Sequence, residues 1–257
     1  MRASLTQGGI VAKQKLQKLL NFENAKTIKG ESRNIVTGII YFAPNTIASD
    51  VSLCVFATEG CIKACLYTSG RGQFTMVQEA RIKKTKSYLA DKVSFIARLE
   101  KEIDNAVKRS SKKGFQLAIR LNGTSDLSVE AWGLMQKFPN VQWYDYTKNP
   151  IRMKKYLAGE LPTNYHLTFS LSETNKDLAL GFLAQGGNVA VVFNTNNPEN
   201  IPATYWGYPT VNGDKDDLRF LDPKGVIVGL KQKGRARKDT LGFVQPIIEE
   251  VKLKLVA

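Results

Sequence analysis

Short apolar segments rich in β-branched residues alternate with helical patterns along most of the chain, and this alternation restricts the folds open to it. The strand-like segments are 34–44, 114–126, 140–150, 164–173, 187–194, 208–214 and 225–234. Helical patterns lie between several of them, at 128–137, 150–158 and 174–185. Strands that alternate with helices form parallel sheets, because each helix returns the chain to the same end of the sheet. The sequence therefore predicts an α/β fold: a complete or partial (β/α) TIM-like barrel with parallel strands.

The 257-residue chain contains no repeat, low-complexity stretch or linker, which favours a single domain over 1–257. Within it we expect an N-terminal helical extension at 1–33, a barrel core at 34–234 and a C-terminal segment at 235–257. No G-x-G-x-x-G follows an early strand and no G-x-x-x-x-G-K-[ST] occurs. Their absence argues against the Rossmann and P-loop nucleotide-binding folds.

The N-terminus and the apolar runs indicate where the protein works. Lys13, Lys15 and Lys18 are interleaved with leucines, which predicts an amphipathic helix rather than a signal peptide. The longest apolar runs, such as "NVAVVF" and "GVIVGL", are far shorter than the roughly 20 residues of a membrane-spanning helix. We therefore expect a cytoplasmic protein with no membrane partner, in a compartment where thiols stay free.

All the cysteines of the chain, Cys54, Cys61 and Cys65, fall in the loop that follows the first strand. Their spacing is C-x6-C-x3-C. Three thiols are one short of a closed tetrahedral zinc site. An iron–sulfur cluster with one iron left unligated by the protein needs three thiolates from one flexible loop, which this segment supplies. Gly60, and Arg71 between two glycines in "SGRG", allow backbone and guanidinium donors to approach such a cluster.

Three other interpretations of the cysteines stay open. Zinc would need a fourth ligand, and His166, the one histidine, stands near the start of its strand, toward the opposite end from the loop. A redox pair is disfavoured because no C-x-x-C occurs. The thiols would otherwise be inert buried side chains that happen to cluster.

Polar side chains end most of the predicted strands, and in a barrel they would gather with the cysteine loop at the carboxyl-end rim, where active sites form. Candidates for acid–base chemistry are Asp126, Asp145, Lys148 and Glu173. Candidates for binding a ligand or cofactor are Arg71, Arg120, Asn122, Ser170 and Asn194. The alternative is a ring of structural salt bridges at the barrel end, with Glu173 capping a helix. The acidic stretch 212–222 is interpreted as a turn rather than a metal site.

A barrel with three cysteines after its first strand resembles the radical S-adenosylmethionine enzymes. That resemblance implies a [4Fe-4S] cluster on Cys54, Cys61 and Cys65, with S-adenosylmethionine bound at the open iron and a nucleotide-like or polyanionic substrate. The spacing differs from the usual C-x3-C-x2-C, and "NGTSD" stands where a Gly-Gly-Glu turn is expected. Stretches such as "RLNGTSD", "YDYTK" and "DLRFLDP" also resemble an uncharacterised family of phage and plasmid proteins.

The formal net charge of +14 is unevenly distributed. Residues 71–113 carry twelve Lys and Arg against five acids, and 231–238 carry five Lys and Arg with no acid. Such patches bind DNA or RNA through phosphates, although a solvated basic surface has the same composition. The sequence therefore supports a second function class: a nucleic-acid-binding accessory protein of a phage or plasmid, with a structural zinc or cluster site.

Overall fold

The computed structural model describes residues 17–23 and 27–248. In this part of the chain nine strands follow the order β1-β2-β3-β4-β5-β8-β7-β6, with β9 pairing to β5. Their bounds are β1 Ile35–Ile39, β2 Gln116–Arg120, β3 Gln142–Thr147, β4 Tyr165–Ser170, β5 Asn188–Phe193, β6 Thr204–Tyr205, β7 Tyr208–Asn212, β8 Ile227–Lys231 and β9 Val244–Gln245. All the pairings are parallel except that of β6 with β7.

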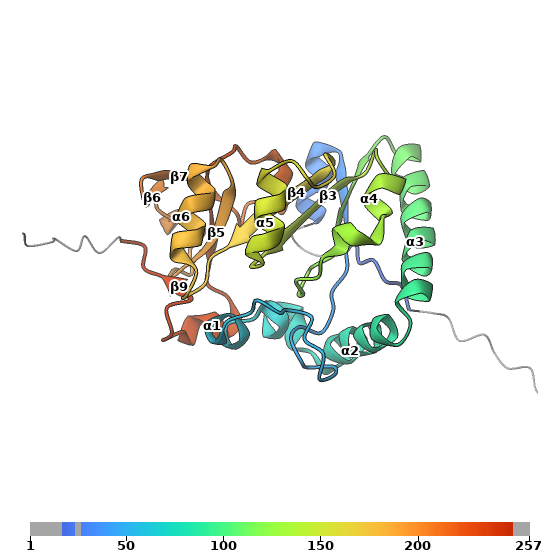
Figure 1. Cartoon of the computed structure of the whole chain (residues 1–257), viewed down its shortest axis with the longest axis horizontal. Coiled ribbons are helices and arrows are strands. Elements are labelled where there is room, and N and C mark those ends of the chain that lie inside the picture. The colour runs from blue at the N-terminus through green and yellow to red at the C-terminus, as the bar shows by residue number, and fades with distance from the viewer. Residues whose placement is uncertain (1–16, 24–26, 249–257) are drawn as a thin grey trace, which may run out of the picture.

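Most of the helices connect these parallel strands. The α-helices are α1 Glu59–Lys63, α2 Thr75–Ala90, α3 Lys92–Lys112, α4 Leu134–Lys137, α5 Pro150–Leu157 and α6 Lys176–Ala184. Short 3-10 helices are η1 Ile28–Arg33, η2 Leu66–Thr68, η3 Gly70–Gln73, η4 Val129–Trp132, η5 Pro198–Asn200, η6 Arg219–Leu221 and η7 Gly234–Lys238. In Figure 1, α5 and α6 lie across one face of the sheet, α3 runs along its edge, and α1 and α2 form a row below it.

The face of the sheet under the helices forms the main core. Residues paired in parallel register share a face, and successive residues alternate between faces. Ile119 therefore lies beside Trp143, and Trp143 beside Tyr165, all fully buried. Leu99 and Ile103 of α3 pack against them at helical spacing. Truncating one of these side chains to alanine costs about 2–5 kcal/mol, because a cavity is added to the lost burial.

The opposite face of the sheet is polar. Alternation places Arg120, Tyr144, Tyr146, His166 and Ser170 there, with Tyr144 in register with His166. No α-helix crosses this face among the described residues; Leu218 and the partly buried Phe220, from the η6 turn, pack against Tyr144 instead. The stretch 212–222, which the sequence predicted to be a turn, thus covers part of the polar face.

The seven predicted strands and the parallel α/β class are confirmed. The two-residue strands β6 and β9 were not predicted. A complete barrel is wrong, because the sheet is open: the β6–β7 hairpin extends it beyond β8, and no strand pairing joins that edge to β1 within the described residues. Asn21 instead pairs with Ile39 on the free side of β1. Most of the predicted N-terminal helix, with Lys13 and Lys15, lies outside the described residues.

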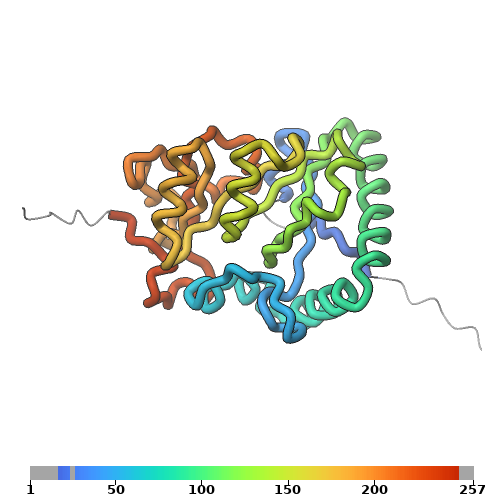
Figure 2. The backbone as a smooth tube through the Cα atoms, in the orientation of Figure 1, coloured from blue at the N-terminus to red at the C-terminus, as the bar shows by residue number. Residues whose placement is uncertain are grey.

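Two consecutive helices, α2 and α3, lie between the cysteine loop and β2. α2 ends at Ala90, and Asp91 caps α3, its side chain accepting a hydrogen bond from the Ser94 backbone N–H at 2.9 Å. Figure 2 shows the segment from β1 to α2 running beneath the sheet and meeting the C-terminal segment at α1. Because this segment follows β1, and Glu173 and Lys148 follow β4 and β3, the cysteine loop lies at the carboxyl ends of the strands.

Candidate functional site

The cysteine loop, residues 45–74, is fixed at α1. Cys61 packs with Ala64, Ala236 and Phe243, so the C-terminal segment covers one side of the helix. The three cysteines are free thiols and are partly buried. The backbone N–H of Cys54 donates to Ser52 Oγ at 3.1 Å.

Glu173 connects the loop to the end of β4. Its carboxylate accepts hydrogen bonds from the Thr58 hydroxyl at 2.8 Å and from the Gly60 N–H at 2.7 Å. Thr58 in turn caps α1 by accepting from the Cys61 N–H at 3.3 Å. A Cβ at position 60 would stand 2.7 Å from the Glu173 carboxylate, so a larger residue there would displace this carboxylate. The predicted site residue Glu173 therefore positions Cys61.

The three thiols are close enough to influence one another. Burial raises the pKa of Cys54 to about 12, and the charges of Asp126, Cys65 and Cys61 also raise it. Burial likewise raises the pKa of Cys65, whereas the nearby cations Lys148 and Arg81 lower it. The protonated forms of Cys54 and Cys65 are therefore favoured in the metal-free protein, and a bound cation would be the natural means of stabilising their thiolates.

No three His, Cys, Asp or Glu side chains of residues 17–23 and 27–248 form a group that could hold a metal ion. His166 is engaged elsewhere: its Nδ1 lies 3.1 Å from the Tyr156 hydroxyl, and its Nε2 3.4 Å from Thr168 Oγ1. Burial lowers the pKa of His166 to about 4, and Arg219 acts in the same direction. The structure thus gives His166 partners in α5 and β4 rather than among the cysteines.

Three predicted residues, Asn122, Asp126 and Asp145, come together in a buried network. Asp145 accepts from the Asn122 N–H at 2.8 Å and from the Tyr165 hydroxyl at 3.2 Å. Arg152 binds Asp126 at 2.7 Å, Glu130 at 2.8 Å and Tyr165 at 2.6 Å. Burial raises the pKa of Asp145 to about 6, against the opposing charges of Arg152 and Arg120. This network ties the ends of β2 and β3 to α5.

Arg120 lies on the polar face, apart from that network. Its Nη1 donates to Asp217 Oδ2 at 3.1 Å, and its guanidinium lies 4.5 Å from the centre of the Tyr146 ring. The Tyr144 hydroxyl donates to Asp217 at 2.9 Å. Tyr144 was not predicted; the alternation within "WYDYT" would have placed it, with Tyr146, on the face opposite Asp145.

The remaining predicted residues are spread around the same rim. Lys148 Nζ lies 5.3 Å from the centre of the Phe243 ring. Ser170 is partly buried, and its carbonyl accepts from Asn175. Arg71 and Asn194 are exposed, and the Asn194 N–H donates to Gln245 at 2.8 Å.

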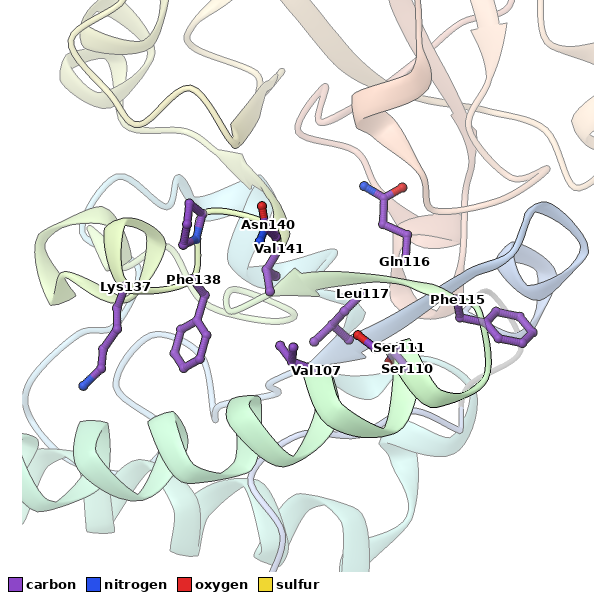
Figure 3. Close-up of a pocket in the computed structure, with 11 residues that line it drawn as sticks. Val107, Ser110, Ser111, Phe115, Gln116, Leu117, Lys137, Phe138, Asn140 and Val141 are labelled. Carbon is purple, nitrogen blue, oxygen red and sulfur yellow. The ribbon is translucent and has the colours of Figure 1, made fainter.

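The surface around the cysteines is unusually apolar. Exposed large hydrophobic side chains in this segment are Ile47, Val51, Val55, Phe56, Ile62, Leu66, Phe74 and Met76. By contrast, a surface pocket of about 280 Å³ lies far from the thiols in sequence and structure. Val107, Gln116 and Lys137 line it, between the end of α3 and the start of β2 (Figure 3). That pocket contains none of the predicted site residues.

The helices of the described chain include none that is both long and apolar enough to span a membrane. Comparison with known proteins finds no matching curated protein and no matching solved structure. It thus gives no support for a relation to the radical S-adenosylmethionine enzymes. The family model described as Gene product 88 matches residues 16–246, in keeping with the phage setting that the sequence indicated. Because the match covers most of its length, the chain belongs to the Gene product 88 family.

Proposed function

We propose that Cys54, Cys61 and Cys65 hold a [4Fe-4S] cluster whose fourth iron is open to a small-molecule ligand. The observation that carries this proposal is the placement of three partly buried thiols in one loop at the carboxyl ends of parallel strands, where Cys61 and Cys65 both raise the pKa of Cys54. Burial disfavours the thiolate forms of Cys54 and Cys65, and iron binding would offset that penalty by displacing the thiol protons.

We prefer a cluster to a zinc ion because the loop offers three thiols, one short of a closed tetrahedral zinc site. His166 does not supply a fourth ligand, because its ring nitrogens lie beside Tyr156 and Thr168. A cubane cluster with one open iron needs only three protein thiolates.

The surrounding residues have defined parts in this proposal. Glu173 holds the first turn of α1, and with it Cys61, in place. Lys148 and Arg81 lie beside Cys65 and offset negative charge there. A cluster of this type supplies one-electron chemistry, and an open iron suits a radical-type enzyme in which S-adenosylmethionine is the ligand.

Anaerobic reconstitution with iron and sulfide tests the proposal. We expect iron and sulfide to bind near four each per chain, with a visible charge-transfer band and a reducible signal in electron paramagnetic resonance. The triple Cys→Ala variant should lose all of these, while Leu66→Ala, which alters an exposed neighbour of Cys65, should keep them. Stoichiometric zinc in a protein that stays colourless after anaerobic reconstitution would exclude the cluster.

Adding S-adenosylmethionine to the reduced protein tests the finer proposal separately. Formation of 5′-deoxyadenosine, abolished by Cys65→Ala, would identify a radical-type enzyme. Its complete absence from a protein that carries the reduced cluster would leave a cluster without this chemistry.

A second candidate function, nucleic-acid binding, rests on the charges of α2 and α3. The acids of α3 are engaged: Asp104 pairs with Lys108, Glu100 with Lys137, and Glu102 accepts from the Leu19 N–H. Exposed cations remain along both helices, namely Lys83, Lys86, Lys92, Lys101, Arg109, Lys112 and Lys113. Arg235, Arg237 and Lys238 are exposed on η7, on the other side of the cysteine loop.

Anisotropy titrations with labelled single- and double-stranded DNA and RNA would measure this binding. We expect affinity to fall steeply with salt, and Lys83→Glu with Lys86→Glu to weaken it about tenfold. Lys154→Glu, an exposed charge reversal on α5, is the control and should have a smaller effect. Binding that is insensitive to salt would contradict a phosphate-dominated interface.

A further inference from the structure

Some of the buried polar atoms that lack a hydrogen-bond partner lie in or near the cysteine loop, whereas others, such as two nitrogens of Arg219, lie elsewhere in the described chain. Among the described residues, Arg81 Nε, Arg120 Nε, Ser69 Oγ and Ser172 Oγ are buried and make no hydrogen bond. Ser69 belongs to the loop itself, and Ser172 precedes the glutamate that holds α1. Native proteins satisfy nearly all such atoms, so a group of them indicates a missing water, ion or ligand.

Arg81 is held in a fixed orientation by its neighbours. Its guanidinium lies 5.0 Å from the centre of the Tyr41 ring and 5.4 Å from that of Tyr67. Its Nη1 donates to the Tyr67 carbonyl at 3.2 Å. A Cβ at Gly72 would stand 2.5 Å from that carbonyl and 3.2 Å from Nη1, so glycine leaves room for the arrangement. A pre-positioned guanidinium loses little entropy when it binds a ligand.

The positive charges of Arg81 and Lys148 are not neutralised by acidic side chains of the described residues. Neither Arg81 nor Lys148 has a carboxylate within ion-pair distance in the described residues, although both lie near Cys65. Arg120 is a third cation, near the same Tyr41 ring, and it is paired with Asp217. All three cations are partly exposed, so an ion from solution can reach them. Two uncompensated positive charges match a dianion better than a monoanion.

We propose that Arg81 and Lys148, with Arg120 behind Tyr41, bind the phosphate group of a small molecule beside Cys65. The fork of a guanidinium suits phosphate oxygens, and Lys148 adds a point charge. The site uses only side chains of this chain and does not require a bound cluster. A phosphate held here would place the rest of its molecule against the cysteine loop.

Isothermal titration calorimetry of the metal-free, full-length protein at constant ionic strength tests the site with inorganic phosphate, adenosine monophosphate and acetate. We expect both phosphate compounds to bind and acetate to bind at least about tenfold more weakly. Arg81→Met should weaken phosphate binding by about tenfold or more, and Arg81→Lys should also weaken it, because an ammonium lacks the fork. Lys154→Met, at an exposed cation on α5 outside both proposed binding surfaces, should leave binding unchanged.

Circular dichroism of each variant establishes that it is folded, and Lys148→Met provides an independent variant should Arg81→Met misfold. Phosphate binding that survives in both Arg81→Met and Lys148→Met would overturn the site, as would acetate binding as tight as phosphate binding. Because the titration uses metal-free protein, its result does not depend on a bound cluster. Absence of phosphate binding refutes this site and leaves the three-thiol proposal standing.

Discussion

Two polar clusters lie at the carboxyl ends of the same parallel strands, and they differ in how completely their groups are paired. In the Arg152 cluster, formed with Asp126, Glu130 and Tyr165, all three guanidinium nitrogens donate hydrogen bonds. In the Arg81 cluster, with Lys148 beside Cys65, a buried Nε has no partner and the cations face no carboxylate. Every guanidinium nitrogen of the first cluster has a partner within the chain, whereas the cations of the second cluster lack an anionic partner among the described residues. Completeness of pairing thus separates a structural cluster from a candidate binding site.

The largest expected effect is on the complete cluster. Arg152→Met leaves two buried carboxylates without their cation, so we expect a loss of about 3–5 kcal/mol in the free energy of unfolding. Urea denaturation measures it. Arg71→Met, at an exposed arginine, is the control and should change stability by less than about 0.5 kcal/mol.

Glu173→Ala is expected to have the next largest effect, because it removes the acceptor of two hydrogen bonds to the start of α1. We expect a loss of about 1–3 kcal/mol and faster hydrogen exchange of the α1 amides. Glu59→Ala removes only a surface pair with Lys63 and should cost less than about 1 kcal/mol. Equal exchange rates in the two variants would show that Glu173 does not hold the loop.

Arg81→Met should leave stability within about 1 kcal/mol of the parent, because no carboxylate loses its partner. The contrast with Arg152→Met is the direct test of the difference between the clusters. If both substitutions destabilise the protein equally in urea, the Arg81 cluster is structural and the comparison fails.

The smallest effect concerns pH. The pKa of Cys54 rises from 9.0 to about 12 on folding, so above pH 9 the unfolded chain loses a proton that the folded chain retains. Stability of the metal-free protein should therefore fall as pH rises through this range, by about 1 kcal/mol for this group at pH 10. Comparing the pH dependence of wild type and Cys54→Ala isolates the contribution of Cys54, and identical slopes would contradict a buried thiol.

The strands could be predicted because runs such as "NVAVVF" have the β-branched composition of buried strands. Whether the sheet closes into a barrel could not be predicted, because closure depends on pairing between distant segments. The hairpin of β6 and β7 continues the sheet outward, and β6 is only two residues long. A two-residue strand has too little periodicity to be recognised in a sequence.

The sequence indicated where the candidate site lies, but not which of its charged side chains form ion pairs. The polar strand ends correctly placed Asp126, Asp145 and Glu173 at one edge. Arg152 was missed because "IRMKKYL" has the charge pattern of a solvated helix, although Arg152 is 2% exposed. Which cations find carboxylates depends on the orientation of α2 and α5, and local sequence does not encode that orientation.

Contact between α1 and residues 236–243 bears on when the cysteine site can mature. Cys61 is covered by Ala236 and Phe243, which are synthesised almost two hundred residues after it. During synthesis, strands β1 to β5 can pair before residues 236–243 leave the ribosome. Cys61 then lacks the side chains that cover it in the folded protein. The complete surroundings of Cys61 therefore form only after residues 236–243 have left the ribosome.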